Sequence, residues 1–250
     1  MSAGDAGAGG VTPRSARAHV FVADLAAPRL TAEDDRHLHR SLRLTPGSAV
    51  TVGDGAGRWR PCRLTGGPEL ADVGDVVVDP EPVPALTVAF ALVKGERPEL
   101  VVQKLTELGV DRIVPFHAER SVVRWDPAKA DRQVDRLQTI ARLASMQCRR
   151  THVPTVDPVA DFAGVAALPG ASMADGDGEP PSLSVRTVLV GPEGGWTPQE
   201  RGFGLPLVRL GAHTLRSETA AITAGALLVA IRSHIVGSIV PAQVKAPHGT

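Results

Sequence analysis

Two glycine-containing blocks near the end of the chain have the residue types needed to hold a nucleotide-like ligand. Residues 188–195 read Val-Leu-Val-Gly-Pro-Glu-Gly-Gly, and residues 210–220 read Leu-Gly-Ala-His-Thr-Leu-Arg-Ser-Glu-Thr-Ala. Each block has an apolar run, a glycine turn and then polar groups. Ligands of open α/β sheets bind outside the carboxyl ends of strands, where such turns lie. The blocks therefore predict two neighbouring loops that hold one ligand between them.

Other ligand motifs fail on spacing. Gly53–Arg58 does not fit G-x-G-x-x-G, and the chain contains no P-loop. Cys62 and Cys148 are far apart and have no ligand-like spacing, so neither a disulfide framework nor a metal site is predicted. Basic and acidic residues are equal in number, 27 each, which excludes a global basic field and leaves only local RNA-binding surfaces.

The chain divides by pattern into five segments. Residues 1–17 are expected to be a disordered tail. Short β-prone runs separated by turn signals predict a small barrel over 18–80. Prolines at positions 80, 82 and 84 predict a stiff, extended segment, and the linker is placed over 81–85. Strand–helix alternation predicts an α/β domain with a mostly parallel sheet over 86–238, followed by a tail over 239–250.

Within the α/β domain we expect helices over 98–108, 128–148 and 218–235. The stretch 163–184 is rich in Gly, Pro and Ser and is expected to form a mobile loop with little structure. Two glycines and a proline within 201–206 prevent a helix there. The longest apolar run has about 12 residues, too few to span a bilayer, so a cytoplasmic protein without a membrane partner is expected.

The two blocks resemble the RsmE family, bacterial methyltransferases that act on N3 of a uridine in 16S ribosomal RNA. Members belong to the SPOUT superfamily and bind S-adenosylmethionine (SAM). The resemblance spans roughly residues 18–235. It rests on Gly191–Gly195, Leu210-Gly211 and Leu215–Ala220, together with Lys94-Gly95, Gln103–Val110, Glu119–Val122, His37–Arg43 and Asp54-Gly55.

The resemblance implies a fold, a cofactor and partners. The fold is a PUA-like RNA-binding β-barrel followed by a SPOUT domain with a trefoil knot, which ordinary topology rules would exclude. SAM is the implied cofactor, and 16S rRNA of the small ribosomal subunit is the implied partner. A homodimer is also implied, in agreement with a last helix that is apolar nearly all round and must be buried on most sides.

Methyl transfer to N3 requires loss of the N3 proton and stabilisation of the forming uridine anion. Arg216 can hold the carbonyl oxygens with its planar guanidinium. Glu218, two residues on, can accept the proton or orient Arg216, although a carboxylate at a helix start also stabilises the helix dipole. We therefore predict Arg216 and Glu218 as the catalytic residues.

The remaining predicted site residues follow from the resemblance. The predicted cofactor-binding residues are Val190, Gly191, Pro192, Glu193, Gly194, Gly195, Leu210, Gly211, Leu215 and Thr219. The predicted RNA-binding residues are His37, Arg40, Arg43, Lys94, Lys104, Arg120, Gln147 and Arg150.

Two departures from the family leave alternatives open. Leu143 stands where members usually have glutamate, and the short 201–206 segment replaces a full helix, which should leave a gap near the cofactor. One alternative is a ribose 2′-O-methyltransferase of the same superfamily. The other is a non-catalytic RNA-binding ribosome-assembly factor. The Lys104-x-x-Glu107 and Glu218 matches favour base methylation, and the two intact blocks favour an enzyme.

Overall fold

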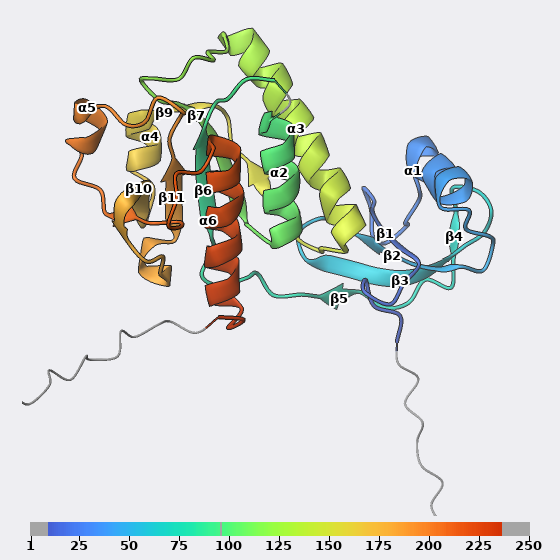
Figure 1. Ribbon diagram of the computed structural model, residues 1–250. Coiled ribbons are helices and arrows are strands. Elements are labelled where there is room, and N and C mark those ends of the chain that lie inside the picture. Colours follow the sequence, from blue (N-terminus) through green and yellow to red (C-terminus); the bar gives the residue numbers. More distant parts are fainter. Residues whose placement is uncertain (1–9, 96, 237–250) are drawn as a thin grey trace, which may run out of the picture.

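A computed structural model describes residues 10–95 and 97–236 (Figure 1). The N-terminal part is a five-stranded sheet in the order β1-β2-β3-β4, with β5 pairing with β3. β1 runs parallel to β2, and the other pairs are antiparallel. The strands are β1 (Ala18–Phe21), β2 (Ala49–Gly53), β3 (Arg58–Leu64), β4 (Leu70–Ala71) and β5 (Val77–Val78).

A short helical segment crosses from β1 to β2. The α-helix α1 (Ala32–Arg36) begins where the Thr31 side chain accepts a hydrogen bond from the Asp34 backbone N–H. A single π-helical turn, His37–Ser41, continues it. Its buried Leu38 anchors the segment in the core of the N-terminal sheet. This arrangement leaves the basic face of the turn exposed to solvent.

The predicted disordered tail is wrong for residues 10–17. The Ala16 N–H donates to the Thr12 carbonyl at 2.8 Å, which closes a turn. The Arg149 guanidinium, from the end of a distant helix, donates to the Pro13 carbonyl at 2.9 Å and to the Arg17 carbonyl at 2.9 Å. Composition alone could not reveal this tie, because its donor lies more than a hundred residues away. Residues 1–9 lie outside the described part.

The C-terminal part is a parallel seven-stranded sheet, as the strand–helix alternation predicts. The order is β12-β10-β11-β6-β7-β8, with β9 also pairing with β7. All its strand pairs are parallel. The strands are β6 (Thr87–Ala91), β7 (Arg112–His117), β8 (Thr155–Val156), β9 (Ala160–Asp161), β10 (Ala171–Glu179), β11 (Thr187–Val190) and β12 (Leu207–Val208).

Helices cover both faces of this sheet (Figure 1). The long helices α2 (Arg97–Leu108), α3 (Pro127–Cys148) and α6 (Ser217–Arg232) enclose a core with Val88 and Phe90. The short helices α4 (Phe162–Ala166) and α5 (Pro198–Arg201) lie on the other side, where Ala89 and Phe116 are buried. Successive β6 side chains thus enter opposite cores, as strand geometry requires.

Close packing of α6 on α2 depends on one glycine. A Cβ atom at Gly225 would lie 2.5 Å from Cδ2 of Leu105 and 3.0 Å from Cγ2 of Val110. The two helices therefore approach closely only because this position lacks a side chain. The helix predicted over 218–235 ends at Arg232, and residues 237–250 lie outside the described part.

The predicted loop over 163–184 is wrong. This segment contains most of α4, all of β10 and a 3-10 turn, Leu183–Val185. Gly176, Gly178 and neighbouring aspartates give β10 a low intrinsic strand propensity. Its first residues are nevertheless strand because they pair with β11 on one side and β12 on the other. Tertiary pairing overrides composition here.

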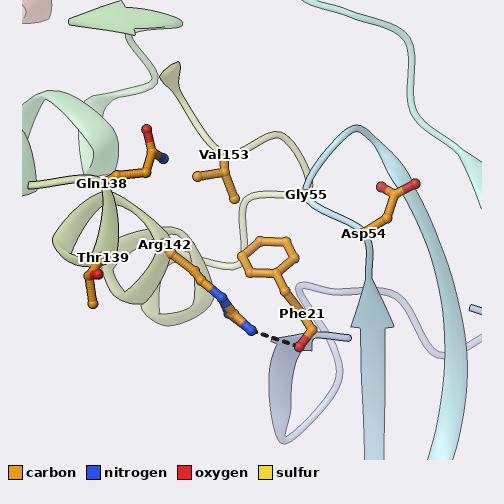
Figure 2. A pocket seen from close by; sticks show the side chains of 7 residues that line it. All are labelled: Phe21, Asp54, Gly55, Gln138, Thr139, Arg142 and Val153. Atoms are coloured by element: carbon orange, nitrogen blue, oxygen red, sulfur yellow. Dashed lines mark hydrogen bonds between the residues drawn. The ribbon is translucent and has the colours of Figure 1, made fainter. Parts of the chain in front are cut away.

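The two parts meet where α3 contacts the N-terminal sheet. Figure 2 shows the Arg142 guanidinium reaching the Phe21 carbonyl, at 2.9 Å, and its carbon lies 5.4 Å from the Phe21 ring centroid. Val153 donates its N–H to the Gly55 carbonyl at 2.8 Å. A hollow of about 240 Å³ at this junction is lined by Phe21, Asp54, Gly55, Gln138, Thr139, Arg142 and Val153. Among the described residues, no helix is long and apolar enough to cross a membrane.

Candidate cofactor cleft

A cleft of about 610 Å³ opens at the carboxyl ends of β11 and β12, beside the middle of β10. The loop after β11 and the loop after β12 both line it, although these strands are not neighbours in the sheet. β10 lies between them and adds Ala174, Asp175 and Gly176 to the wall. Eight of the ten predicted cofactor residues line the cleft: Val190, Gly191, Pro192, Glu193, Gly195, Leu210, Gly211 and Leu215. Gly194 and Thr219 do not.

The first loop, residues 191–197, is held by bonds from three directions. The Ser217 hydroxyl donates to the Gly191 carbonyl at 2.9 Å, and the Trp196 indole N–H donates to the Ala174 carbonyl at 3.0 Å. Arg120 donates from one Nη1 to the Gly194 carbonyl at 3.0 Å and to the Trp196 carbonyl at 3.3 Å. Arg120, predicted to contact RNA, is therefore engaged with the backbone of this loop.

Gly195 gives this loop its turn. Its φ of +66° lies in the left-handed region, and its N–H donates to the Pro192 carbonyl at 2.9 Å. A Cβ atom at Gly195 would meet no atom within 4 Å, so the residue is open toward the cleft that it lines. Glycine is the residue that adopts this conformation without steric cost.

Aromatic side chains pack beside the shortened 201–206 segment. α5 ends at Arg201, as the glycines at 202 and 204 predict. Trp196 stacks on Phe116 with ring centroids 6.4 Å apart. Phe162 meets Trp196 edge-on at 5.7 Å and Phe203 edge-on at 5.0 Å. Large rings thus pack next to the shortened segment.

A buried carboxylate fixes α5 to the strand-end loop of β7. Thr197 and Glu200 form a reciprocal capping box at the start of α5. Glu200, only 3% exposed, also accepts the Glu119 N–H at 2.9 Å. The Glu119 carboxylate in turn accepts the Thr197 hydroxyl at 2.7 Å. The Glu119–Val122 motif of the sequence thus supports the first cleft loop.

The second loop, residues 209–216, is far less constrained. Gly211 to Thr214 are exposed, and Leu215 is half-buried. The Arg209 N–H donates to the Glu179 carbonyl at 2.9 Å, which ties the start of the loop to β10. Arg201, ion-paired with Asp175, and Arg209 give the cleft cations, while Asp175 and Glu193 give it carboxylates. Charges of both signs suit a zwitterionic ligand.

The two predicted catalytic residues differ in their surroundings. Arg216 is the exposed N-cap residue of α6. Glu218 lies in the first turn, and its side chain is 13% exposed. Its Oε1 lies 3.7 Å from Nε of Arg97, whereas its Oε2 is buried and has no hydrogen-bond partner among the described residues. Glu218 is thus paired with Arg97. The predicted role of orienting Arg216 would instead require a contact between Glu218 and Arg216.

Arg97 was missed by the sequence analysis. It is the first residue of α2, and its Nη1 also lies 3.0 Å from Oε1 of Glu193. The one sequence signal is its place just after Lys94-Gly95, at the end of a buried strand. Its two acidic partners are about 100 residues away in sequence, so no local pattern indicates the contact.

Six of the eight predicted RNA-binding residues, all except Arg120 and Arg150, lie in three regions of the protein. His37, Arg40 and Arg43 are exposed on the helical segment of the N-terminal part, and Lys94 is exposed after β6. Lys104 pairs with Glu107 at 2.8 Å. A hollow of about 540 Å³ between α2 and α3 is lined by Gln103, Lys104, Glu107, Ile140, Leu143, Ala144 and Gln147. Leu143, which stands where family members usually have glutamate, therefore lines this hollow.

Arg150, predicted to contact RNA, is engaged inside the protein. Its side chain is 14% exposed, and it donates to the Val110 carbonyl at 2.6 Å and to Oδ1 of Asp111 at 2.9 Å. Burial lowers the pKa of the guanidinium, and the Asp111 charge opposes this shift. Arg150 therefore joins the end of α3 to the α2–β7 turn. In residues 10–95 and 97–236, no group of acidic, His or Cys side chains could hold a metal ion.

Comparison with known proteins agrees with this geometry. Residues 79–229 match the model of an RNA methyltransferase domain, and residues 30–73 match that of an RNA methyltransferase PUA domain. A ribosomal RNA small subunit methyltransferase E from Mycobacterium bovis is 34% identical over 214 residues, which cover 75% of this chain and 80% of the relative.

Solved structures show the same architecture. A ribosomal RNA small subunit methyltransferase E from Neisseria gonorrhoeae, bound to S-adenosyl methionine, has a TM-score of 0.71 and 28% identity, covering 85% of this chain and 97% of its own. A Legionella pneumophila protein in complex with SAM also has a TM-score of 0.71, with 27% identity, covering 85% of this chain and 96% of its own. The chain therefore belongs to the ribosomal RNA small subunit methyltransferase E family, with a PUA domain before its RNA methyltransferase domain.

Proposed function

We propose that this protein transfers a methyl group from SAM to N3 of a uridine in 16S rRNA of the small ribosomal subunit. The observation that carries the proposal is the convergence of both sequence blocks on one cleft. Arg216 and Glu218 are chain neighbours of Leu215 and Ser217, which line that cleft. The names of the relatives, small-subunit rRNA methyltransferases, support the choice of substrate.

The cleft residues fit SAM, which supplies a methyl group on a sulfonium. The volume of about 610 Å³ lies within the range of small-molecule sites. Gly191 and Gly195 allow backbone atoms to approach the cofactor, and Leu210 and Leu215 offer apolar contact to its adenine. Carboxylates and guanidinium groups at the cleft suit its amino and carboxylate groups.

The residues beside the cleft would then accept the uridine N3 proton and stabilise the negative charge that forms on the base. The Glu218 carboxylate, whose side chain is 13% exposed, accepts the N3 proton of the uridine. The exposed Arg216 guanidinium donates to the uracil carbonyl oxygens and stabilises the anion as it forms. No metal ion is required for this chemistry. Exposed basic residues, among them His37, Arg40 and Arg43, would contact phosphates and position the RNA.

The proposal also includes a homodimer, a trefoil knot and a cytoplasmic location. Apolar residues along α6, such as Ile222, Ala226 and Ile231, are only half-buried in the single chain, which supports coverage by a second copy. The trefoil knot is part of the proposal because the family that the chain belongs to resembles the knotted SPOUT superfamily. A cytoplasmic location follows from the proposed ribosomal substrate.

Calorimetric titration with SAM, followed by nucleoside analysis of methylated small subunits, tests the proposal. We expect micromolar binding by the full chain and a 3-methyluridine product. Gly195→Trp should weaken SAM binding by more than about 100-fold, because a large side chain would enter the cleft. Gly204→Trp is the matched control, since Gly204 has a φ of +67° and equally open space but does not line the cleft.

The outcomes separate the three functions. A ribose-methylated product would show that the protein is a 2′-O-methyltransferase and not a base methyltransferase. Absence of SAM binding in the wild type would favour the non-catalytic RNA-binding factor. Equal loss of binding in both glycine variants would place the cofactor elsewhere.

A further inference from the structure

One guanidinium joins the two halves of the cleft. Nη1 of Arg97 lies 3.0 Å from Oε1 of Glu193 in the first loop, and its Nε lies 3.7 Å from Oε1 of Glu218 at the start of α6. Arg97 itself comes from the start of α2, on neither loop. A single cation is thus shared between two carboxylates that come from the two different sequence blocks.

The contact leaves the two oxygens of Glu218 in different surroundings. Oε1 faces Arg97, while Oε2 is buried without a hydrogen-bond partner among the described residues. A buried unpaired carboxylate oxygen is costly, and a catalytic role is one recognised reason for it. Oε2 of Glu99 is also buried and without a partner among the described residues, so what distinguishes Glu218 is its position beside Ser217, which lines the cleft. The cation beside Oε1 offsets the charge of the group without occupying the second oxygen.

We propose that Arg97 is a positioning residue, which holds the Glu218 carboxylate beside the cleft, where it accepts the proton of the bound base. This inference rests on the proposed function, because it assigns a partner to the proton acceptor of the same site. Through Glu193, Arg97 also fixes the first loop relative to α6. Arg97 is not assigned a contact with the reacting atoms.

A plain surface ion pair is the rival explanation, since the Arg97 side chain is 40% exposed. Exposed pairs contribute little to stability. The chain contains a matched example between the same two classes of residue. Nη2 of Arg136 lies 3.3 Å from Oε1 of Glu99 on α2, with Arg136 58% exposed and Glu99 17% exposed. This pair lies outside the cleft lining, so it serves as the control.

Methylation of small subunits by the full chain tests the proposal through a split between rate and affinity. Arg97→Ala should lower the single-turnover rate at saturating SAM by about 10- to 100-fold, the scale of a disturbed general base. The SAM Kd, measured by calorimetry, should change by less than about threefold, because hydrogen bonds from Arg120, Ser217 and Trp196 still hold the first loop when its Arg97–Glu193 contact is lost. Arg97→Lys should recover most of the rate, and Arg136→Ala should match the wild type.

A double-mutant cycle asks whether Arg97 acts through Glu218. In a Glu218→Gln background, Arg97→Ala should cause little further loss of rate, because the group that it positions is already altered. Fully additive losses would overturn the proposal, as would an Arg97→Ala variant with the wild-type rate. A rate loss that Arg97→Lys does not relieve would also contradict it.

A measurement on the cofactor-free protein keeps the inference separate from the proposed function. The Arg97 Nε–H resonance, assigned by its loss in Arg97→Lys, should exchange with solvent several-fold more slowly in the wild type than in Glu218→Gln. Equal exchange in the two proteins would overturn the contact in solution. If the wild type methylates no rRNA, the proposed function fails, whatever the Nε–H exchange shows. If it does methylate and Arg97→Ala is silent, only the inference fails.

Discussion

The two loops that line the cleft are built in opposite ways. The first, residues 191–197, receives hydrogen bonds from Arg120 and Ser217 and places Trp196 in an aromatic core. The second, residues 209–216, lies exposed over its central four residues. One wall of the site therefore exists before any ligand arrives, whereas the other has few internal contacts to fix it.

This difference assigns separate tasks to the loops. A preformed wall lowers the entropy cost of binding, because its backbone is already ordered. An exposed loop of low local stability can close over a ligand and open again to release it. Changes to side chains that anchor the first loop should therefore affect the fold, whereas changes in the second loop should affect ligand affinity alone.

The largest expected effect is on the fold, through Trp196. The side chain is 7% exposed and packs on Phe116 and Phe162. Trp196→Ala should lower the free energy of unfolding by about 3–5 kcal/mol, as for other large-to-small core changes. Urea denaturation measures it. Phe203→Ala is the control, since Phe203 is 53% exposed, and it should cost less than about 1 kcal/mol. Similar losses in both variants would mean that Trp196 is not part of the core.

A smaller effect is expected from the second loop. Leu215→Ala should leave the urea midpoint nearly unchanged but weaken SAM binding by about tenfold, equivalent to about 1.4 kcal/mol of lost apolar contact. Calorimetry measures the affinity. Leu143→Ala, an exposed change in the hollow between α2 and α3, should alter neither quantity. If Leu215→Ala destabilised the fold as Trp196→Ala should, the contrast between the loops would disappear.

Features marked by apolar periodicity or by glycine turns were predictable from sequence. The buried strand β6 and the helices α2 and α3 follow from apolar runs and stripes, and both cleft loops follow from their glycines. These signals are local, since each depends on residues within one turn or one strand. The position of the cleft at the carboxyl ends of parallel strands then follows from the fold class.

Features that depend on distant partners were not predictable. β10 carries Gly176 and Asp175 and reads as a loop, yet two neighbouring strands hold it in the sheet. Arg97 looks like any surface arginine until Glu193 and Glu218 are placed beside it. Arg150 shows the opposite case. This basic residue is expected on the surface, but its guanidinium donates hydrogen bonds to an internal carbonyl and to Asp111.

Hydrogen–deuterium exchange of the full chain, with and without saturating SAM, tests the central claim most directly. The account predicts that amides of residues 209–216 become protected by more than about tenfold, since the open loop orders over the cofactor. Amides of Gly195 and Thr197, already bonded to the Pro192 carbonyl and the Glu200 carboxylate, should change much less. Protection confined to another surface, or none in residues 209–216, would contradict the assignment of this cleft as the SAM site.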